Sequence, residues 1–410
     1  MKGLYAVSSF LLYIVISRKL GAEEAGYFFL TQTIIILSAF LVRQGFDSAI
    51  IKNVAGYHYH NDCNNIAGVY RLCLTRIVPV SLITVFILFF SSAWIAEFIF
   101  DKPNLNQVFR IGFLAIIPIA ISQLHGFFFQ GQKKIILAMT FDTVLLSFAS
   151  AVSFYIFNPE SASDGMVLYC VLSFVVGFGA ILTWNFDRVP KLFKLDLNTR
   201  NEIQNTAKSL FVIIILLQTT QWVGQLILGV FGTPQEVAIF ATAQRTAMLV
   251  SFVLISVNAI AAPKFAEAYK KGEYDEIRKV AKISSRIMFF VSVPVVSIML
   301  LFSSWLMGLF GAEFDRGEVI LRILVIGQFV NVLTGSVGYL LQMTGNEKIF
   351  RDSVFISSLI MIFGSVVFIP NFGIVGAAWV STIAIATQNL LCVYQVKKKL
   401  GFNTLNIFSR

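Results

Sequence analysis

Charged residues are scarce in this sequence. They make up 13% of its 410 residues, whereas 57% are hydrophobic. Soluble domains usually carry about a quarter charged residues, so this composition excludes an ordinary soluble fold. The hydrophobic residues also occur in long blocks, which is typical of helices surrounded by lipid. The sequence therefore predicts an all-α integral membrane protein.

Cysteine and histidine are also few, with four and three residues respectively. The cysteines have neither a paired spacing nor a metal-binding spacing, which excludes a disulfide framework and a zinc site. His58 and His60 lie in an expected loop without a third ligand nearby, so no metal site is predicted. No cofactor is expected either, and coupling to a proton or sodium gradient is left open.

Hydrophobic segments long enough to cross a bilayer number about twelve. A spanning helix needs roughly 20 apolar residues. The segments are 3–17, 26–42, 77–96, 111–130, 135–157, 165–184, 209–231, 238–262, 287–309, 323–343, 352–369 and 374–396.

Lysine and arginine predict the orientation of these spans. With the N-terminus in the cytoplasm and the loops assigned to alternate sides, 25 of the 32 basic residues fall on the cytoplasmic side and 6 on the other. Such an excess marks the cytoplasmic face of membrane proteins. Both termini are therefore predicted to be cytoplasmic. The net charge of +10 is explained by orientation, and no nucleic-acid partner is expected.

The chain contains an internal repeat. The segment 21–32 resembles 232–244, and three further residues, Arg110, Gly126 and Gln130, recur 212 positions later as Arg322, Gly338 and Gln342. Six expected helices separate the copies, so both copies have the same orientation. Residues 1–185 are predicted to form an N-terminal six-helix bundle, 186–208 a cytoplasmic linker, and 209–410 a C-terminal six-helix bundle with a short cytoplasmic tail. Parallel repeats of this kind are typical of transporters.

Three segments carry a family resemblance: SRKLGAEEAGYF (17–28), AAPKFAEAY (261–269) and IPNFGIVGAA (369–378). With them, essentially the whole chain resembles the polysaccharide-export branch of the multidrug/oligosaccharidyl-lipid/polysaccharide flippase superfamily. The resemblance implies a MATE-like fold and a lipid-linked sugar as cargo. In the O-antigen (Wzx-type) subfamily, undecaprenyl pyrophosphate carries the oligosaccharide.

The same resemblance implies partners and a location. The partners would be a polyprenyl-pyrophosphate-linked oligosaccharide, membrane lipid, and polysaccharide polymerase and chain-length proteins. The location would be the bacterial inner membrane. In one respect the sequence departs from the family: many relatives carry an aspartate in the seventh helix where this chain has Gly224-Gln225. A coupling carboxylate is therefore absent at that point.

Two charged residues lie well inside the predicted spans, Asp142 and Arg245. A charge at bilayer depth costs at least about 2.5–3.5 kcal/mol, so each needs a reason to be there. Arg245 could bind a pyrophosphate, because a guanidinium forms forked hydrogen bonds with phosphate oxygens. Asp142 could act as a protonation switch. The alternative for both is an anchor between helices that never contacts the cargo.

The remaining candidate residues of a substrate cavity are polar side chains on the predicted helices. Arg43 and Asp47 share one face if the second helix continues past Gly45, although a local ion pair at the helix end is nearly as plausible. A glutamine stripe on the seventh helix, beside Trp222, could bind sugars or join helices. The full set is Arg245, Gln244, Arg43, Asp47, Gln123, His125, Asp142, Gln218, Gln221 and Gln225.

These observations favour a flippase that moves an undecaprenyl-pyrophosphate-linked oligosaccharide from the cytoplasmic to the periplasmic leaflet by alternating access. A MATE-like multidrug or cation antiporter is the alternative, although it would favour more acidic residues in the spans. A membrane glycan polymerase is a third hypothesis. Its chemistry needs room outside the membrane, whereas the expected outer loops 18–25, 158–164 and 370–373 are short. The protein is thus predicted not to be an enzyme, with no catalytic residues.

Overall fold

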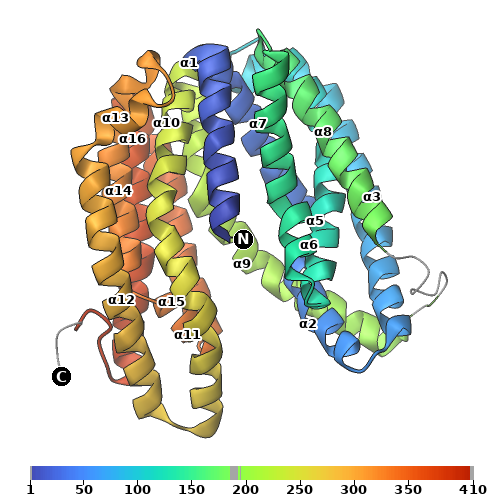
Figure 1. Ribbon diagram of the computed structural model, residues 1–410, viewed down its shortest axis with the longest axis vertical. Helices are drawn as coiled ribbons and strands as arrows, with labels where there is room; N and C mark the ends of the chain where they lie inside the picture. The colour runs from blue at the N-terminus through green and yellow to red at the C-terminus, as the bar shows by residue number, and fades with distance from the viewer. Residues whose placement is uncertain (1, 185–192, 194, 407–410) are drawn as a thin grey trace. The chain divides into compact units, whose positions relative to one another are not determined.

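The computed structural model describes residues 2–184, 193 and 195–406, and these are helical almost throughout (Figure 1). The chain forms two compact units, residues 1–215 and 216–410, called here the N-terminal and C-terminal units. Most of the first half of the predicted linker, 186–192 and 194, lies outside the described residues. Within its second half a long helix, α9 (Leu197–Phe231), begins and runs across the boundary between the units.

The N-terminal unit begins with one very long helix and continues with shorter ones. Its elements are α1 (Lys2–Val42), α2 (Phe46–Tyr59), α3 (Cys63–Trp94), the π-helical η1 (Ile95–Ile99), α4 (Leu105–Phe113), α5 (Ile116–Gly131), α6 (Ile135–Met139), the π-helical η2 (Thr140–Val144), α7 (Leu145–Phe157), α8 (Ala162–Thr183) and the first part of α9.

The C-terminal unit also consists of long and short helices. After the rest of α9 it contains α10 (Pro234–Ala247), the short 3-10 helix η4 (Met248–Val250), α11 (Ser251–Lys271), α12 (Tyr274–Leu301), α13 (Ser303–Gly308), η5 (Ala312–Gly317), α14 (Glu318–Leu333), α15 (Val337–Met343) and α16 (Glu347–Leu400).

The two longest helices, α1 and α16, each fold back on themselves at a glycine. Gly21 interrupts α1 with φ 73° and ψ 178°. In a straight helix, Tyr13 and Phe29 would lie about 24 Å apart at 1.5 Å per residue. Their rings are instead stacked with centroids 4.3 Å apart. The two halves of α1 therefore pack as an antiparallel pair.

The reversal in α16 occurs at Gly373, where φ is 55° and ψ is −138°. The Ser357 hydroxyl donates to the Ala384 carbonyl at 2.8 Å, although 27 residues separate them. Both reversals lie in short segments that the sequence analysis assigned to outer loops, so the hydrophobic blocks on either side of each glycine were separated correctly.

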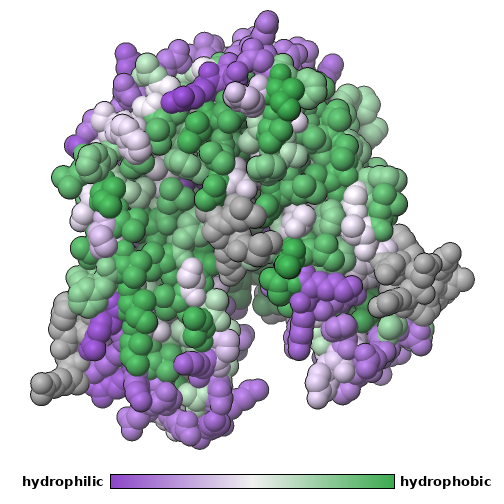
Figure 2. Space-filling model, in the orientation of Figure 1, coloured by the Kyte–Doolittle hydropathy of each residue, from purple (hydrophilic) through white to green (hydrophobic). Residues whose placement is uncertain are grey.

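Among the described residues, eight helices are long and apolar enough to cross a membrane, or ten if each of two bent pairs forms one span. The hairpins α1 and α16 are each included once in that number. Length and composition do not place a helix in a bilayer, so the number twelve stays a prediction. Figure 2 shows hydrophobic side chains over the middle of the helices and hydrophilic ones at their ends. On α8, for example, Val171, Phe174 and Phe178 are exposed, as expected of a surface that faces lipid.

A polar contact recurs at equivalent positions of the two units. In the N-terminal unit, Arg110 Nε donates to Ser92 Oγ at 3.2 Å, and that hydroxyl donates to Asn106 Oδ1 at 2.9 Å. These contacts join the end of α3 to α4.

In the C-terminal unit, Arg322 Nε donates to Ser303 Oγ at 2.8 Å, and the Ser303 hydroxyl donates to Glu318 Oε1 at 3.4 Å. Arg322 and Glu318 also form an ion pair. All three residues lie 211 or 212 positions after their counterparts. The same helix junction is therefore built twice, as the parallel repeat in the sequence predicts.

We expect Ser303→Ala to lower the free energy of unfolding by about 1 kcal/mol, because a buried hydroxyl that bridges two helices is lost. Thermal unfolding of the purified protein in detergent measures the change. Ser256→Ala is the matched control, since the Ser256 hydroxyl is exposed and bonds only within its own helix, to the Phe252 carbonyl. Equal midpoints for both variants would contradict a stabilising role of the junction.

Candidate functional site

The first candidate cluster forms where the chain leaves α1. The helix does not continue past Gly45, as one interpretation of the sequence had expected: Gln44 and Gly45 have positive φ angles of 51° and 77°, and α2 begins afresh at Phe46. A side chain at Gly45 would overlap the Ala207 carbonyl and Phe211 of α9. Glycine permits this close approach and this backbone conformation.

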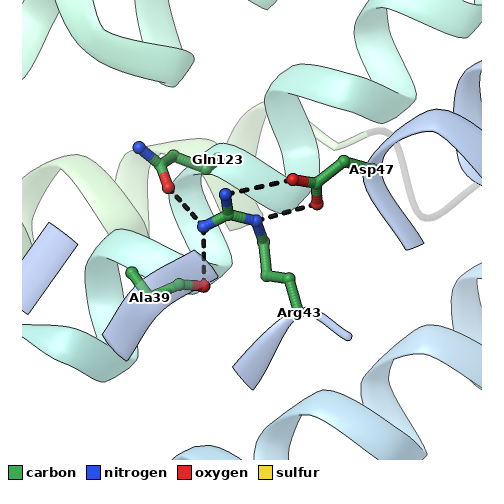
Figure 3. A network of polar contacts seen from close by, with 4 residues as sticks. All are labelled: Ala39, Arg43, Asp47 and Gln123. Carbon is green, nitrogen blue, oxygen red and sulfur yellow. Dashed lines mark hydrogen bonds and ion pairs between the residues drawn. The ribbon is translucent and has the colours of Figure 1, made fainter. Parts of the chain in front are cut away.

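Arg43 lies at this break and is almost completely buried, with 1% of its surface exposed. Its Nε donates to Asp47 Oδ1 at 2.8 Å and its Nη2 to Asp47 Oδ2 at 3.1 Å, which makes a forked ion pair (Figure 3). Its Nη1 donates to the Ala39 carbonyl at 2.8 Å and to Gln123 Oε1 at 2.5 Å. We call these four residues the Arg43 network. It uses four of the five N–H groups of the guanidinium.

Two aromatic rings complete the surroundings of Arg43. The guanidinium carbon lies 4.6 Å from the ring centroid of Phe40 and 5.8 Å from that of Phe127, which is within the range of cation–π attraction. A buried guanidinium is tolerated when it is paired and hydrogen-bonded. The Arg43 network thus joins α1, α2 and α5. In this conformation an anionic ligand would have to displace Asp47 to reach the guanidinium.

Asp142 lies close to this network. It belongs to η2, and its Cβ is 3.2 Å from the position that a Cβ on Gly126 of α5 would take. It is half-buried and within electrostatic reach of Arg43 and Asp47. π-helical turns inside helices often occur at functional sites. The structure therefore brings Arg43, in the turn after α1, together with Asp47 of α2, Gln123 of α5 and Asp142 of η2.

His125 lies two residues from Gln123 but has different surroundings. It is fully buried. One ring nitrogen contacts the Tyr70 hydroxyl at 3.1 Å, and the other contacts the Ile121 carbonyl at 2.8 Å. Its ring also packs edge-on against Trp184. In this structure His125 belongs to the aromatic core of the N-terminal unit and not to the Arg43 network.

The second candidate cluster lies in the C-terminal unit, between α9 and α10. The Trp222 Nε1 donates to Gln218 Oε1 at 2.9 Å, one helical turn away. The Arg245 guanidinium carbon lies 5.8 Å from the Trp222 ring centroid. Gln218 and Arg245 are half-buried. We call Gln218, Trp222 and Arg245 the Arg245 cluster.

The other predicted glutamines of this region hold the two helices together. Gln244 donates from Nε2 to the Gln221 carbonyl at 2.9 Å, and Gln221 Nε2 contacts Met248 Sδ at 3.2 Å. Gln225 is 1% exposed. The predicted stripe therefore divides: Gln218 contacts Trp222, near which Arg245 also lies, whereas the Gln221 carbonyl accepts a hydrogen bond from α10 and Gln225 is buried.

The two clusters differ in what they can bind. A carboxylate, an amide and a carbonyl occupy four of the five N–H groups of the Arg43 guanidinium. Arg245 is half-buried, whereas Arg43 is almost completely buried, and the Arg245 guanidinium carbon lies 5.8 Å from the centroid of one indole ring. The guanidinium group can bind a phosphate through two forked hydrogen bonds. No group of three or more His, Cys, Asp and Glu side chains among the described residues could hold a metal ion.

The sequence analysis missed the aromatic partners of Arg43. Phe40 lies three residues before Arg43, and Phe127 lies four residues after Gln123. Both spacings place the rings on the same helix face as the polar residue. That spacing was the available signal, although it does not reveal that two separate helices bring their rings to one guanidinium.

Comparisons with known proteins identify the family of this chain. A family model described as polysaccharide biosynthesis protein matches residues 15–316. The chain belongs to this family. A curated relative from Haloferax volcanii, a probable low-salt glycan biosynthesis flippase named Agl15, is 23% identical over 92% of this chain and 77% of its own length.

Solved structures show the fold that this family member adopts. An inward-facing multidrug resistance MATE transporter of the MOP superfamily has a TM-score of 0.82 at 14% identity and covers all of this chain and 96% of the transporter. The lipid II flippase MurJ, in an inward closed conformation, has a TM-score of 0.73 at 13% identity over 96% of this chain and 87% of its own. The predicted MATE-like, multi-pass membrane fold is confirmed. These similar proteins are transporters and flippases, in agreement with the prediction that the chain is not an enzyme.

Proposed function

We propose that this family member is a flippase for a lipid-linked oligosaccharide, which it moves from the cytoplasmic to the outer leaflet. The observation that carries the proposal is membership of a polysaccharide biosynthesis family together with a MATE-like fold. The proposed carrier lipid is undecaprenyl pyrophosphate and the proposed location is the bacterial inner membrane, with both termini in the cytoplasm. Polysaccharide polymerase and chain-length proteins are the proposed partners downstream.

The Arg245 cluster supports an anionic, sugar-bearing cargo. A guanidinium can form two parallel hydrogen bonds with a pyrophosphate, and at partial burial these bonds are stronger than in water. The half-buried Gln218 side chain offers amide hydrogen bonds for sugar hydroxyl groups, and the buried Trp222 ring, 8% exposed, contacts both Gln218 and Arg245. We assign the pyrophosphate to Arg245 and the adjoining sugars to Gln218, with Trp222 supporting both side chains.

The Arg43 network has a different part in this proposal. Its contacts are internal to the N-terminal unit: Arg43 forms an ion pair with Asp47 of α2 and donates a hydrogen bond to Gln123 of α5. We infer that the Arg43 network fixes the shape of this unit. We also infer that the charges of Arg43 and Asp47 influence the protonation of Asp142 beside them. A role for Asp142 in coupling to a proton gradient remains a hypothesis of this proposal.

A multidrug exporter is the second candidate, because the MATE transporter covers the whole chain with a TM-score of 0.82. Cationic drugs would need a carboxylate that is free to pair with them. Asp47 is already paired with Arg43, and Glu236 caps the start of α10. Asp142 lies within electrostatic reach of the Arg43 guanidinium, and Arg245 is half-buried in α10. These charges favour an anionic cargo over a cationic one.

Deleting the gene in its own host tests the flippase. The expected result is loss of surface polysaccharide, with lipid-linked repeats accumulating on the cytoplasmic leaflet. Their side can be measured in spheroplasts by their accessibility to an impermeant lectin before and after lysis. Normal surface polysaccharide in a host without a second transporter, combined with increased sensitivity to cationic drugs, would favour the exporter instead.

A further inference from the structure

One face of α12 carries basic and hydrophobic side chains together. Lys279 and Arg286 are both exposed and lie seven residues apart, or about 10 Å along the same face of the helix. Ile283, Ile287 and Phe290 lie on this face as well and are 47%, 48% and 59% exposed. Because α12 is long and apolar enough to cross a membrane, such side chains face lipid. We call this surface the α12 face, and it consists of Lys279, Lys282, Ile283, Arg286, Ile287 and Phe290.

The charges of the α11–α12 hairpin are separated along its length. Its four acidic residues lie between 267 and 276, near the turn at Gly272. The following segment, 278–286, contains four basic residues and no acidic one, and the next acidic residue along the chain is Glu313. Figure 2 shows hydrophilic side chains at the α11–α12 turn, beside the hydrophobic surface of these helices. Positive charge is therefore concentrated at the border of the hydrophobic surface.

The equivalent helix of the N-terminal unit lacks this concentration of charge. The repeated junction relates Ser92 to Ser303, at an offset of 211 positions. At this offset, residues 278–286 of α12 correspond to residues 67–75 of α3, which contain one basic residue. The repeated fold therefore does not require the additional basic residues of α12.

The phosphate group of a membrane lipid suits the chemistry of the α12 face. Lysine and arginine side chains lay their stems along apolar surface and extend their charged ends toward the headgroups. Each basic residue near an anionic membrane surface strengthens the attraction about fivefold, and Arg286 can also form forked hydrogen bonds with one phosphate. Lys279 Nζ lies 4.0 Å from Glu276 Oε2, but these side chains are 69% and 48% exposed. Water screens an exposed pair of this kind, so the pair competes weakly with a phosphate.

We propose that the α12 face binds one anionic phospholipid of the surrounding bilayer. The headgroup phosphate contacts Lys279, Lys282 and Arg286, and an acyl chain lies along Ile287 and Phe290. The bound lipid holds α12 at a fixed depth in the leaflet nearest the α11–α12 turn. This phospholipid is a component of the membrane and not the transported cargo, so the proposal does not depend on the flippase function.

The thermal midpoint of the purified full-length protein in detergent, with added lipid and without cargo, tests the proposal. We expect phosphatidylglycerol to raise the midpoint by about 3 °C more than phosphatidylcholine with the same acyl chains. Native mass spectrometry should show one phosphatidylglycerol retained per chain. The triple variant Lys279→Gln/Lys282→Gln/Arg286→Gln should weaken this retention about tenfold to a hundredfold and abolish the difference between the two lipids. In phosphatidylcholine its midpoint should equal that of the wild type, which would show that the variant folds.

The triple variant Lys397→Gln/Lys398→Gln/Lys399→Gln is the matched control. These three lysines are exposed in the last turn of α16, in the same unit, and their replacement removes the same charge. Because they are consecutive, they point in different directions around the helix and form no single face. This variant should respond to phosphatidylglycerol like the wild type.

Three results would overturn the site. If both lipids give the wild type the same midpoint and no phosphatidylglycerol is retained, the α12 face has no preference among lipids. If the two triple variants lose retention equally, the lipid follows net charge and has no site on α12. If inorganic phosphate raises the midpoint as much as phosphatidylglycerol does, the face binds a soluble anion. Loss of retention in the α12 variant with polysaccharide export intact would uphold the site and separate it from transport.

Discussion

Removing either partner of the buried Arg43–Asp47 pair should destabilise the protein by about 3–5 kcal/mol. The Arg43 side chain is 1% exposed and that of Asp47 is 9% exposed. Arg43→Ala leaves a buried carboxylate without its partner, and Asp47→Ala leaves a guanidinium in the same position. Thermal unfolding in detergent and the yield of monodisperse protein would measure the loss.

The double variant Arg43→Leu/Asp47→Leu separates charge from packing. With no charge left unpaired, it should recover a large part of the stability that each single variant loses. If the double variant is as unstable as the single ones, the cost arises from packing around Phe40 and Phe127, and the ion pair does not govern it.

An exposed pair with the same sequence spacing provides the control. Glu267 and Lys271 on α11 are 65% and 55% exposed, and their charged atoms are 2.6 Å apart. Ion pairs at the surface contribute little, because water and salt screen them. Lys271→Ala should therefore leave the midpoint unchanged. A loss as large as that of Arg43→Ala would contradict the assignment of the effect to burial.

The Arg43 network illustrates how far the sequence can predict a site of this kind. Hydrophobic blocks located the helices, and the four-residue spacing correctly suggested that Arg43 could meet Asp47. The pattern did not reveal that the chain breaks between them, because the break depends on Gly45 meeting Ala207 and Phe211. Only the fold brings α9, far along the chain, to that glycine.

The remaining members of the network had no local signal. Gln123 reaches Arg43 from 80 residues away. Asp142 was recognised as an intramembrane charge. Its position beside the network, however, depends on the π-helical turn η2 and on Gly126 of α5, where the lack of a side chain allows Asp142 to approach closely. Changes of helical register arise from packing, and periodicity does not predict them.

The internal repeat was more accessible to sequence reasoning. The recurrence of Arg110 as Arg322 was visible in the sequence, since both stand at a constant offset. Their serine partners were not, because Ser92 and Ser303 lie 18 and 19 residues away from their arginines. A repeat in sequence thus identified equivalent positions, and the structure supplied the contact that those positions preserve.

Arg245→Ala should reduce polysaccharide export about tenfold to a hundredfold, which is the second large effect expected of this protein. A hydrogen bond to a charged group is worth about 1.5–3 kcal/mol, and each 1.36 kcal/mol corresponds to a factor of ten. Export is measured as surface polysaccharide in the deletion strain that expresses each variant, normalised to the amount of protein in the membrane. Lipid-linked repeats should accumulate in proportion.

Arg245→Lys should lie between Arg245→Ala and the wild type. Lysine retains the positive charge but loses the forked geometry and the stacking on Trp222. Trp222→Phe keeps an aromatic face while it removes the Nε1 donor to Gln218. It should therefore weaken export less than Trp222→Ala does.

Arg316→Ala is the control for a general effect of charge, because Arg316 is an exposed arginine of the same unit, on η5. Cells that express this variant should export normal amounts of polysaccharide. The order of the variants at position 245 then identifies the interaction: an active Lys variant beside an inactive Ala variant indicates that charge alone holds the cargo, whereas equal loss in both indicates that the fork and the ring are needed. Full activity of Arg245→Ala and Arg245→Lys alike would remove Arg245 from the site, and with it the proposed contact to the pyrophosphate.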